Sequence, residues 1–303
     1  MTTTSWQGRT AVITGAASGF GLETARLAAR KGMNVVMADV MEEPLAAAVR
    51  EIEALGAQVL ALRCDVRNAA EIEAMGAATQ ARFGAPHLVF NNAGVGAGGL
   101  IWEHTARDWD WVMGVNVMGV AHGVRVFTPM MLAAEKADPG YSGHIVNTAS
   151  MAGLVSMPNM GVYNVSKHAV VALSETLYQD LKLVSERVHA HVLCPYFVPT
   201  GIAHSERARP QDAHEDGRRA TASQRLAQGL IEKAVAGGRV TAADVAQFVF
   251  DALEADRFYI YSHPKALAPV MTRAEDIVSA TNPSDPYRER PELGEQLRAA
   301  LRR

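Results

Sequence analysis

Short runs of apolar and β-branched residues alternate with longer stretches rich in Ala, Leu and Glu over the first two-thirds of the chain. The short runs have the length and composition of β-strands, and the longer ones have the composition of helices. Strands that alternate with helices indicate βαβ units and a parallel sheet. The predicted strands are 10–14, 34–38, 58–62, 87–90, 144–147 and 189–193, and the predicted helices are 21–31, 44–55, 69–83, 105–136 and 163–187.

The predicted strands are apolar along almost their whole length. Such strands are typical of a sheet that helices cover on both faces. With right-handed crossovers, these elements form a doubly wound α/β fold of the Rossmann type, in three layers. The carboxyl ends of the strands then border a crevice where ligands bind.

The last third of the chain has a different pattern. Residues 204–220 hold no aliphatic side chain larger than Ala, which predicts a mobile surface segment. Because no stretch has the composition of a linker, we expect a single domain over 1–303. Its expected parts are a core at 8–202, a mobile substrate-loop region at 203–240 and a C-terminal elaboration at 241–303, which comprises a helix at 241–255, a strand at 257–261, a helix at 265–280 and a Pro-rich turn at 282–291.

Composition excludes several classes of function. The chain has 303 residues, 49% of them apolar, and a net charge of −3, whereas a nucleic-acid binder needs a basic face. Its two cysteines, Cys64 and Cys194, lie in apolar runs, so we expect buried thiols, no disulfide framework and no metal site. Met1 to Gly8 lack an apolar signal core, and no run of about 20 apolar residues indicates a membrane span. We expect a cytoplasmic protein.

The first candidate site is the glycine-rich sequence that joins the first strand to the first helix, Thr14-Gly15-Ala16-Ala17-Ser18-Gly19-Phe20-Gly21. Gly15 permits a tight turn, Gly19 lets the backbone approach a pyrophosphate, and Gly21 permits close helix packing. The start of the helix then offers unpaired N–H groups to the phosphates. An ordinary strand-to-helix turn would explain the glycines alone. The candidate cofactor contacts here are Gly15, Ser18, Gly19, Phe20 and Gly21.

Asp39 ends the second strand, 18 residues after Gly21. A carboxylate there accepts hydrogen bonds from the adenosine ribose. It would also repel the 2′-phosphate of NADP by about 1–4 kcal/mol, and no Arg or Lys follows it closely. We therefore expect NAD as cofactor in preference to NADP, although Asp39 could instead be a plain loop acid.

Two further strand ends carry candidate cofactor residues. Asp65 follows the third strand and would contact adenine, or cap the next helix. The fourth strand is followed by Asn91-Asn92-Ala93-Gly94, whose small residues let the backbone run beside a ligand. An asparagine amide there could also link two loops. The candidate contacts are Asp65, Val66, Asn92, Ala93 and Gly94.

Tyr163 and Lys167 are four residues apart in a predicted helix, so their side chains share one face. Tyrosine has a pKa of about 10, too high for a base near neutrality. A nearby ammonium favours the phenolate, and a shift of about 3 units needs about 4 kcal/mol. A positively charged nicotinamide would add to the effect. A Tyr/Lys pair on a solvated helix face is the alternative.

Two polar residues add to this pair. Ser150 follows the fifth strand, 13 residues before Tyr163, and its hydroxyl could hydrogen-bond a substrate oxygen. Asn116 lies inside the predicted helix 105–136, where a polar amide needs partners. It could hold a water that connects to Lys167, or bond the backbone at a kink.

These motifs, in their order and spacing over residues 8–202, resemble the short-chain dehydrogenase/reductase family. The resemblance implies a catalytic tetrad of Asn116, Ser150, Tyr163 and Lys167. Tyr163 would be the general acid/base, and Lys167 would bind the nicotinamide ribose and lower the Tyr163 pKa. Ser150 would position the substrate, and Asn116 would support a proton relay through water. Family members are usually dimers or tetramers that pair through the helices carrying Asn116 and Tyr163.

The family also has a Pro-Gly-x-Val-x-Thr stretch after its sixth strand, which here is Pro195-Tyr196-Phe197-Val198-Pro199-Thr200. By resemblance, Pro195, Val198 and Thr200 would contact the cofactor, with Thr200 at the carboxamide. Tyr196 replaces a glycine, so it either reshapes the pocket or packs on the sheet edge. About forty residues follow 257–261, a layout similar to bacterial dehydrogenases of lignin-derived aryl alcohols.

The expected substrate pocket is apolar. Methionines adapt to varied shapes, and three of them lie between Ser150 and Tyr163. The arginines of the polar stretch, Arg207 and Arg209 among them, are expected in a solvated loop. We expect an NAD-dependent dehydrogenase of a bulky, neutral secondary alcohol, with an NADPH-dependent ketoreductase and a non-catalytic dinucleotide sensor as alternatives. The expected pocket residues are Met151, Met157, Met160, Tyr196 and Phe197.

Overall fold

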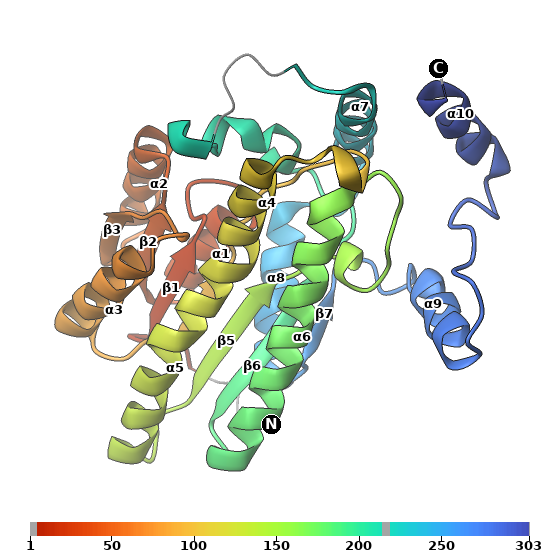
Figure 1. The fold of residues 1–303 in the computed structure, drawn as a ribbon. Coiled ribbons are helices and arrows are strands. Elements are labelled where there is room, and N and C mark those ends of the chain that lie inside the picture. Colours follow the sequence, from red (N-terminus) through yellow and green to blue (C-terminus); the bar gives the residue numbers. More distant parts are fainter. Residues whose placement is uncertain (1–4, 214–218, 303) are drawn as a thin grey trace.

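A computed structural model describes residues 5–213 and 219–302, which contain a seven-stranded parallel sheet (Figure 1). The strand order is β3-β2-β1-β4-β5-β6-β7, and each neighbouring pair is parallel. This order confirms the predicted doubly wound Rossmann-type fold. The strands are β1 Thr10–Thr14, β2 Asn34–Asp39, β3 Val59–Arg63, β4 Leu88–Asn91, β5 Gly143–Thr148, β6 Val188–Cys194 and β7 Tyr259–Tyr261.

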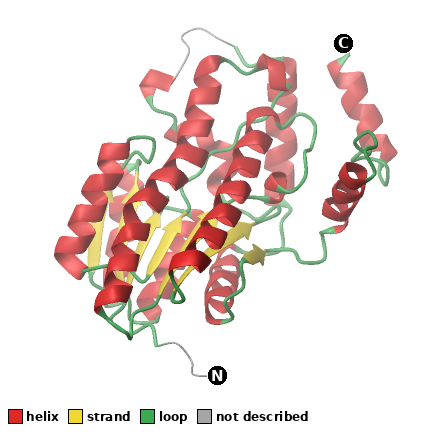
Figure 2. Cartoon of the chain, turned by 60° about the horizontal axis from the view of Figure 1, so that its bottom comes forward, coloured by secondary structure: helices red, strands yellow, loops and turns green. Residues whose placement is uncertain are grey.

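Helices cover both faces of the sheet, so the molecule has three layers (Figure 2). Successive side chains of a strand point to opposite faces. Ala11 and Ile13 of β1 pack with one set of helices, α1, α2 and α8, whereas Val12 packs with α3, α5 and α6. These helices are α1 Gly19–Arg30, α2 Glu42–Ala54, α3 Ala69–Phe83, α5 Gly119–Ala137, α6 Gly161–Val184 and α8 Ala242–Glu254.

The crossover order places a switch point beside β1, which pairs with β2 on one side and β4 on the other. The chain therefore leaves β1 and β4 in opposite directions along the sheet. Ligands of open α/β sheets bind in the crevice at such a point, at the carboxyl ends of the strands. The loops after β1, β4, β5 and β6 all open at this edge.

The predicted helix 105–136 is interrupted. Helix α4, Ala106–Met113, runs into a π-helical turn at Gly114–Met118, and α5 follows. Such turns are frequent at functional sites.

Among the described residues, one helical stretch, 106–137, is long and apolar enough by composition to span a membrane. Within an apolar segment of 18 residues in this stretch, 28% is buried inside the molecule.

The C-terminal third differs most from the sequence-based expectation. Part of the predicted mobile region forms 3₁₀ turns at Gly201–Ala208 (η4) and Gln211–Ala213 (η5), while 214–218 lie outside the described residues. Helices α7, Ala222–Ala236, and α10, Pro291–Leu301, were not expected. The other predicted elements are confirmed: α8 lies within the predicted helix 241–255, β7 within strand 257–261, and α9, Ala268–Val278, within helix 265–280.

Helices α9 and α10 lie apart from the main body in both views (Figures 1 and 2). All residues of α9 are described and none is buried, and α10 buries Gly294 alone. The arm formed by α9 and α10 therefore gains little stability from the core of its own chain.

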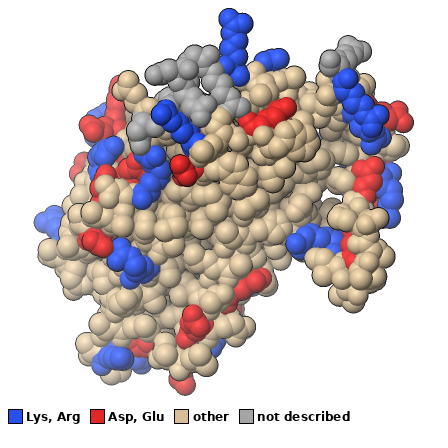
Figure 3. All heavy atoms as spheres, viewed as in Figure 1, with Lys and Arg blue, Asp and Glu red and all other residues tan. Residues whose placement is uncertain are grey.

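Figure 3 shows a face whose middle, over α6 and the neighbouring part of α5, is uncharged, with acidic and basic side chains toward its edge.

Candidate active site

The expected tetrad residues lie around the carboxyl ends of β4 and β5. Asn116 lies in the π-helical turn and is fully buried. Its Oδ1 accepts a hydrogen bond from Val95 N at 2.8 Å, and its Nδ2 donates to Val95 O at 3.0 Å. The same Nδ2 donates to Ser166 Oγ at 3.0 Å, one residue before Lys167. The amide thus joins the loop after β4 to helix α6 and bonds backbone at the π-helical turn, while its part in a water relay stays a prediction.

Lys167 extends from α6 to the end of β5. Its buried Nζ donates to Thr148 O at 2.9 Å and lies 5.6 Å from the ring centroid of Tyr163. A Cβ atom placed on Gly94 would lie 3.4 Å from Asn116 Oδ1 and 3.5 Å from Lys167 Nζ. The small residue therefore lets the loop after β4 pass directly beside both polar groups.

Ser150 starts the 3₁₀ turn Met151–Gly153 (η3) that follows β5. Its Oγ accepts from Ala152 N at 3.1 Å and donates to Pro195 O at a long 3.5 Å. A donor held at that distance is weakly engaged. The same hydroxyl interacts with the Tyr163 phenol, so the two groups lie together at the strand end.

The pKa of Tyr163 differs from the expected direction. Burial raises it above the ordinary value of 10.0, and the hydrogen bond to Ser150 offsets only part of this. Burial also lowers the pKa of Lys167 to about 8. Burial of the ring disfavours the phenolate, whereas the expected lowering of the Tyr163 pKa by Lys167 stays a prediction.

The loops after β1 and β4 form one hydrogen-bonded unit. Thr14 Oγ1 accepts from Asn92 N at 2.9 Å and Ala93 N at 3.0 Å, and Asn92 Nδ2 donates to Thr14 O at 3.0 Å. Gly15 has a positive φ of 64°, and a Cβ atom on it would lie 2.9 Å from Ala93 Cα. Asn91 bonds Asn147 Oδ1 at 2.9 Å. Both asparagines therefore link neighbouring strand ends.

The start of α1 faces the segment after β6. A Cβ atom on Gly21 would lie 2.2 Å from Gly15 O, so the helix packs tightly on its own turn. Gly19, at φ 55°, approaches Thr200. Within the described residues Ser18, the N-cap, makes no side-chain cap bond. Free N–H groups at a helix start attract phosphate, so the turn fits the pyrophosphate of a dinucleotide.

Asp39 lies beside this turn. Its Oδ2 accepts from Ala17 N and its Oδ1 from Met41 N, both at 3.0 Å. Each carboxylate oxygen keeps a further lone pair for a ribose hydroxyl. Asp39 is therefore more than a plain loop acid, because it fixes the glycine-rich turn to the end of β2.

Asp65 pairs with Arg67 at 2.7 Å. It does not cap α3, because the N-cap is Asn68, whose side chain accepts from Ala70 N at 3.1 Å. Val66 is buried against Gly119 at the start of α5. The carboxylate of Asp65 is thus held at the end of β3 by a neighbouring guanidinium, and the adenine contact stays a prediction.

The segment after β6 joins the site to the sheet edge. Pro195 O accepts from Met151 N at 2.9 Å, and Tyr196 N donates to Ser262 Oγ at 2.9 Å. Tyr196 is 47% exposed and packs against Phe197 and His263, with ring centroids 4.6 and 5.7 Å away. Its φ lies outside the positive region, so the missing glycine leaves no backbone strain there. Val198 is buried.

The methionine-rich segment lies against the loop after β4. Gly99 N donates to Asn159 O at 3.0 Å, and Gly99 forms a parallel bridge with Met160. Met151 is buried, whereas Met157 and Met160 are half-buried. These side chains border the site between the loops after β4 and β5, and their contact with a substrate stays a prediction.

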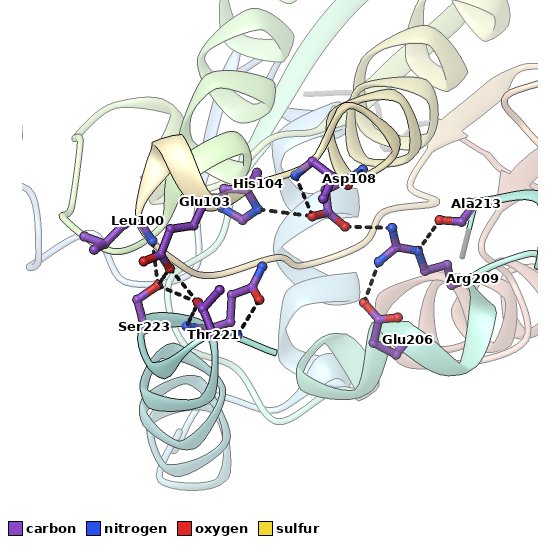
Figure 4. A network of polar contacts seen from close by, with 11 residues as sticks. Leu100, Glu103, His104, Asp108, Glu206, Arg209, Ala213, Thr221 and Ser223 are labelled. Carbon is purple, nitrogen blue, oxygen red and sulfur yellow. Dashed lines mark hydrogen bonds and ion pairs between the residues drawn. The ribbon is translucent and has the colours of Figure 1, made fainter. Parts of the chain in front are cut away.

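Sequence reasoning missed a polar network that fixes the segment after β6 (Figure 4). Arg209 was expected in a solvated loop, but its side chain is 10% exposed, pairs with Asp108 at 2.7 Å and stacks over Trp111 at 4.7 Å. Thr221 and Ser223 both donate to Glu103. The Thr221–Gln224 capping box is a local signal that could have revealed α7, whereas these pairings join residues more than 100 positions apart.

Comparison with known proteins gives the family. A family model described as short chain dehydrogenase matches residues 9–211. A CLA biosynthesis dehydrogenase/reductase of Lactiplantibacillus plantarum is 34% identical over 268 residues, which cover 88% of this chain and 92% of that protein. The 1-deoxy-11-beta-hydroxypentalenate dehydrogenase of Streptomyces exfoliatus is 34% identical over 275 residues, which cover 89% of each protein.

A solved structure matches the whole fold. The crystal structure of a short chain dehydrogenase/reductase from Burkholderia phymatum in complex with NAD is 52% identical, with a TM-score of 0.90. The match covers 93% of this chain and 99% of that one. Together with the glycine-rich turn and the placement of Tyr163 and Lys167, these similarities place the chain in the short-chain dehydrogenase family.

Proposed function

We propose that the protein is an NAD-dependent oxidoreductase that interconverts a bulky, mainly apolar secondary alcohol and its ketone, with Tyr163 as general acid/base. The observation that carries this proposal is the placement of Lys167 Nζ, 5.6 Å from the Tyr163 ring and beside Gly94 at the switch-point crevice. The NAD-bound relative at 52% identity supports the cofactor, and Asp39 beside the glycine-rich turn supports NAD over NADP.

The proposed chemistry follows from the placement of the polar groups. When bound, oxidised NAD supplies the hydride acceptor and a positive charge. The Tyr163 phenolate accepts the proton of the substrate hydroxyl, and the Ser150 hydroxyl hydrogen-bonds the same oxygen. Lys167 is held by Thr148 O, so its charge stays close to the phenol through the reaction. Asn116 has one Oδ1 lone pair left for a water of the proton relay.

The proposed substrate class rests on the walls of the site. Met151, Met157 and Met160 offer flexible apolar contacts, and aryl alcohols fit such a wall. The Streptomyces relative is named for a hydroxypentalenate, which supports a hydroxylated substrate. A small acidic substrate would need a cation at the pocket, and Arg209 is engaged by Asp108 instead.

A panel of secondary alcohols tests the proposal. Purified protein is mixed with NAD or NADP and each alcohol, and reduced nicotinamide is followed by its absorbance. We expect turnover with NAD and bulky apolar or aryl alcohols. Turnover with NADP alone would favour the ketoreductase, and NAD binding without turnover of any alcohol or ketone would favour the non-catalytic sensor.

We also propose a homodimer or homotetramer that pairs through α5 and α6. The uncharged middle of the face over these helices supports this (Figure 3). Met118, just before α5, and Val165, in α6, are 46% and 39% exposed, which is typical of a contact surface. Sedimentation equilibrium should give two or four times the mass of one chain, and a concentration-independent monomer would contradict the proposal.

A further inference from the structure

Arg207 belongs to η4, on the segment after β6, yet it reaches the glycine-rich turn after β1. Its Nη2 lies 3.5 Å from Ser18 Oγ, the N-cap of α1. A Cβ atom on Gly201 would lie 2.1 Å from the same Nη2, so the guanidinium occupies space that a side chain at 201 would fill. Two segments 189 residues apart thus meet at the start of α1.

Among the described residues, no carboxylate neutralises the charge of Arg207. Glu206, the residue before it, pairs with Arg209 at 3.2 Å. In the described ranges, 5–213 and 219–302, no carboxylate forms an ion pair with Arg207, which is exposed. The exposed guanidinium therefore keeps its donors for an anion.

Neighbouring contacts hold η4 in this position. Ser205 Oγ accepts from Gly96 N at 2.8 Å and donates to Ile202 O at 2.7 Å. Thr200, just before η4, lies against Gly19. The turn that carries Arg207 is therefore fixed to the loop after β4 and to the start of α1.

We propose that Arg207 binds the pyrophosphate of the dinucleotide, opposite the N–H groups at the start of α1. This rests on the proposed use of NAD. A guanidinium donates two parallel hydrogen bonds to phosphate oxygens, and a helix start attracts the same charge. Asp39 disfavours the other phosphate that could lie near Ser18, the 2′-phosphate of NADP. The segment after β6 thus contributes to cofactor binding as well as to the substrate side.

Titration with ADP and with adenosine tests the proposal, because only ADP carries a pyrophosphate. Kd values are measured by calorimetry for the wild type and for Arg207→Gln. The control is Arg225→Gln, which removes an exposed arginine of α7. We expect Arg207→Gln to raise the Kd of ADP about tenfold, which corresponds to about 1.4 kcal/mol, and to leave that of adenosine unchanged. Arg207→Lys should be intermediate, and Arg225→Gln should match the wild type.

Three results would overturn the assignment: an unchanged ADP affinity, an equal loss for adenosine and ADP, or a loss confined to NADP. The second would indicate a distorted turn, which the melting temperature of Arg207→Gln reports independently. Titration of the wild type tests the proposed use of NAD separately. If the wild type bound neither ADP nor NAD, the proposed function would fail along with the assignment, whereas wild-type binding with an unaffected variant would refute the role of Arg207 alone.

Discussion

The two sides of the crevice are built by different kinds of contact. On the cofactor side, Thr14, Asn92 and Asp39 bond backbone groups of adjacent loops. On the substrate side, side chains pair with side chains distant in sequence, as Arg209 does with Asp108, 101 residues away. Short motifs mark both ends of the first arrangement, although Thr14 and Asn92 lie 78 residues apart. The substrate-side pairings form only once the whole chain has folded.

The difference has energetic consequences. Contacts to backbone at the ends of β1 and β4 belong to the centre of the sheet, where the strands are buried on both faces, and they open only when the sheet does. The substrate-side segment is held to α4 and to the loop after β4 by a few polar contacts, such as those of Arg209 with Asp108 and of Ser205 Oγ with Gly96 N. It should therefore open locally with the sheet intact, which suits a segment that a substrate must pass.

Of the variants that compare the two sides, Gly21→Ala on the cofactor side has the largest expected effect. The added Cβ would lie 2.2 Å from Gly15 O, so the turn must move. We expect the NADH affinity to fall about a hundredfold, equivalent to about 2.7 kcal/mol, in a fluorescence titration. Gly229→Ala in α7 is the matched control, since no atom lies within 4 Å of its Cβ, and should raise stability by up to about 1 kcal/mol. If Gly21→Ala bound NADH as tightly as the wild type does, the claim that the glycine-rich turn cannot move would be refuted.

The next effect concerns the charge beside the turn. Asp39→Asn removes the repulsion toward a 2′-phosphate while keeping one oxygen to accept a backbone hydrogen bond. The ratio of kcat/KM for NAD over NADP should fall about tenfold or more. Asp65→Asn should leave the ratio unchanged, because the Asp65 carboxylate pairs with Arg67. If both variants kept the wild-type ratio, Asp39 would not set cofactor choice.

The smallest effect is expected on the substrate side. Arg209→Ala leaves the mostly buried Asp108 without its partner guanidinium. Hydrogen exchange in α7 should accelerate, and KM for the alcohol should rise about fivefold, with a smaller change in NADH affinity. Arg225→Ala should change none of these values. Unchanged exchange in α7 would show that the Arg209 pairing does not hold the segment.

The sequence predicts most of the sheet and the proximity of Tyr163 and Lys167. Strand 10–14 is observed as predicted, and 144–147 lies within Gly143–Thr148, because buried parallel strands are continuous apolar runs. Tyr163 and Lys167 share a helix, so their proximity follows from spacing. Local patterns specify these features, and no knowledge of distant contacts is needed.

Features that depend on distant contacts were not predictable in this way. The π-helical turn at Asn116 forms where its amide bonds Val95, 21 residues earlier, and burial of Arg209 requires Asp108 and Trp111. The pKa of Tyr163 rises because of burial, which the i,i+4 spacing to Lys167 does not reveal. The sequence places the reactive groups together, but the environment of those groups depends on the packing of the whole chain.

Tyr163→Phe tests the central claim most directly, by alcohol oxidation measured against pH with NADH binding measured in parallel. In the proposed mechanism the Tyr163 phenolate is the base. Because burial raises the pKa of Tyr163, wild-type kcat/KM should climb tenfold per pH unit below that pKa. The variant should bind NADH as the wild type does, lose about 10²–10⁴ in kcat, and lose the pH slope. A variant that keeps the wild-type rate and slope would contradict the account.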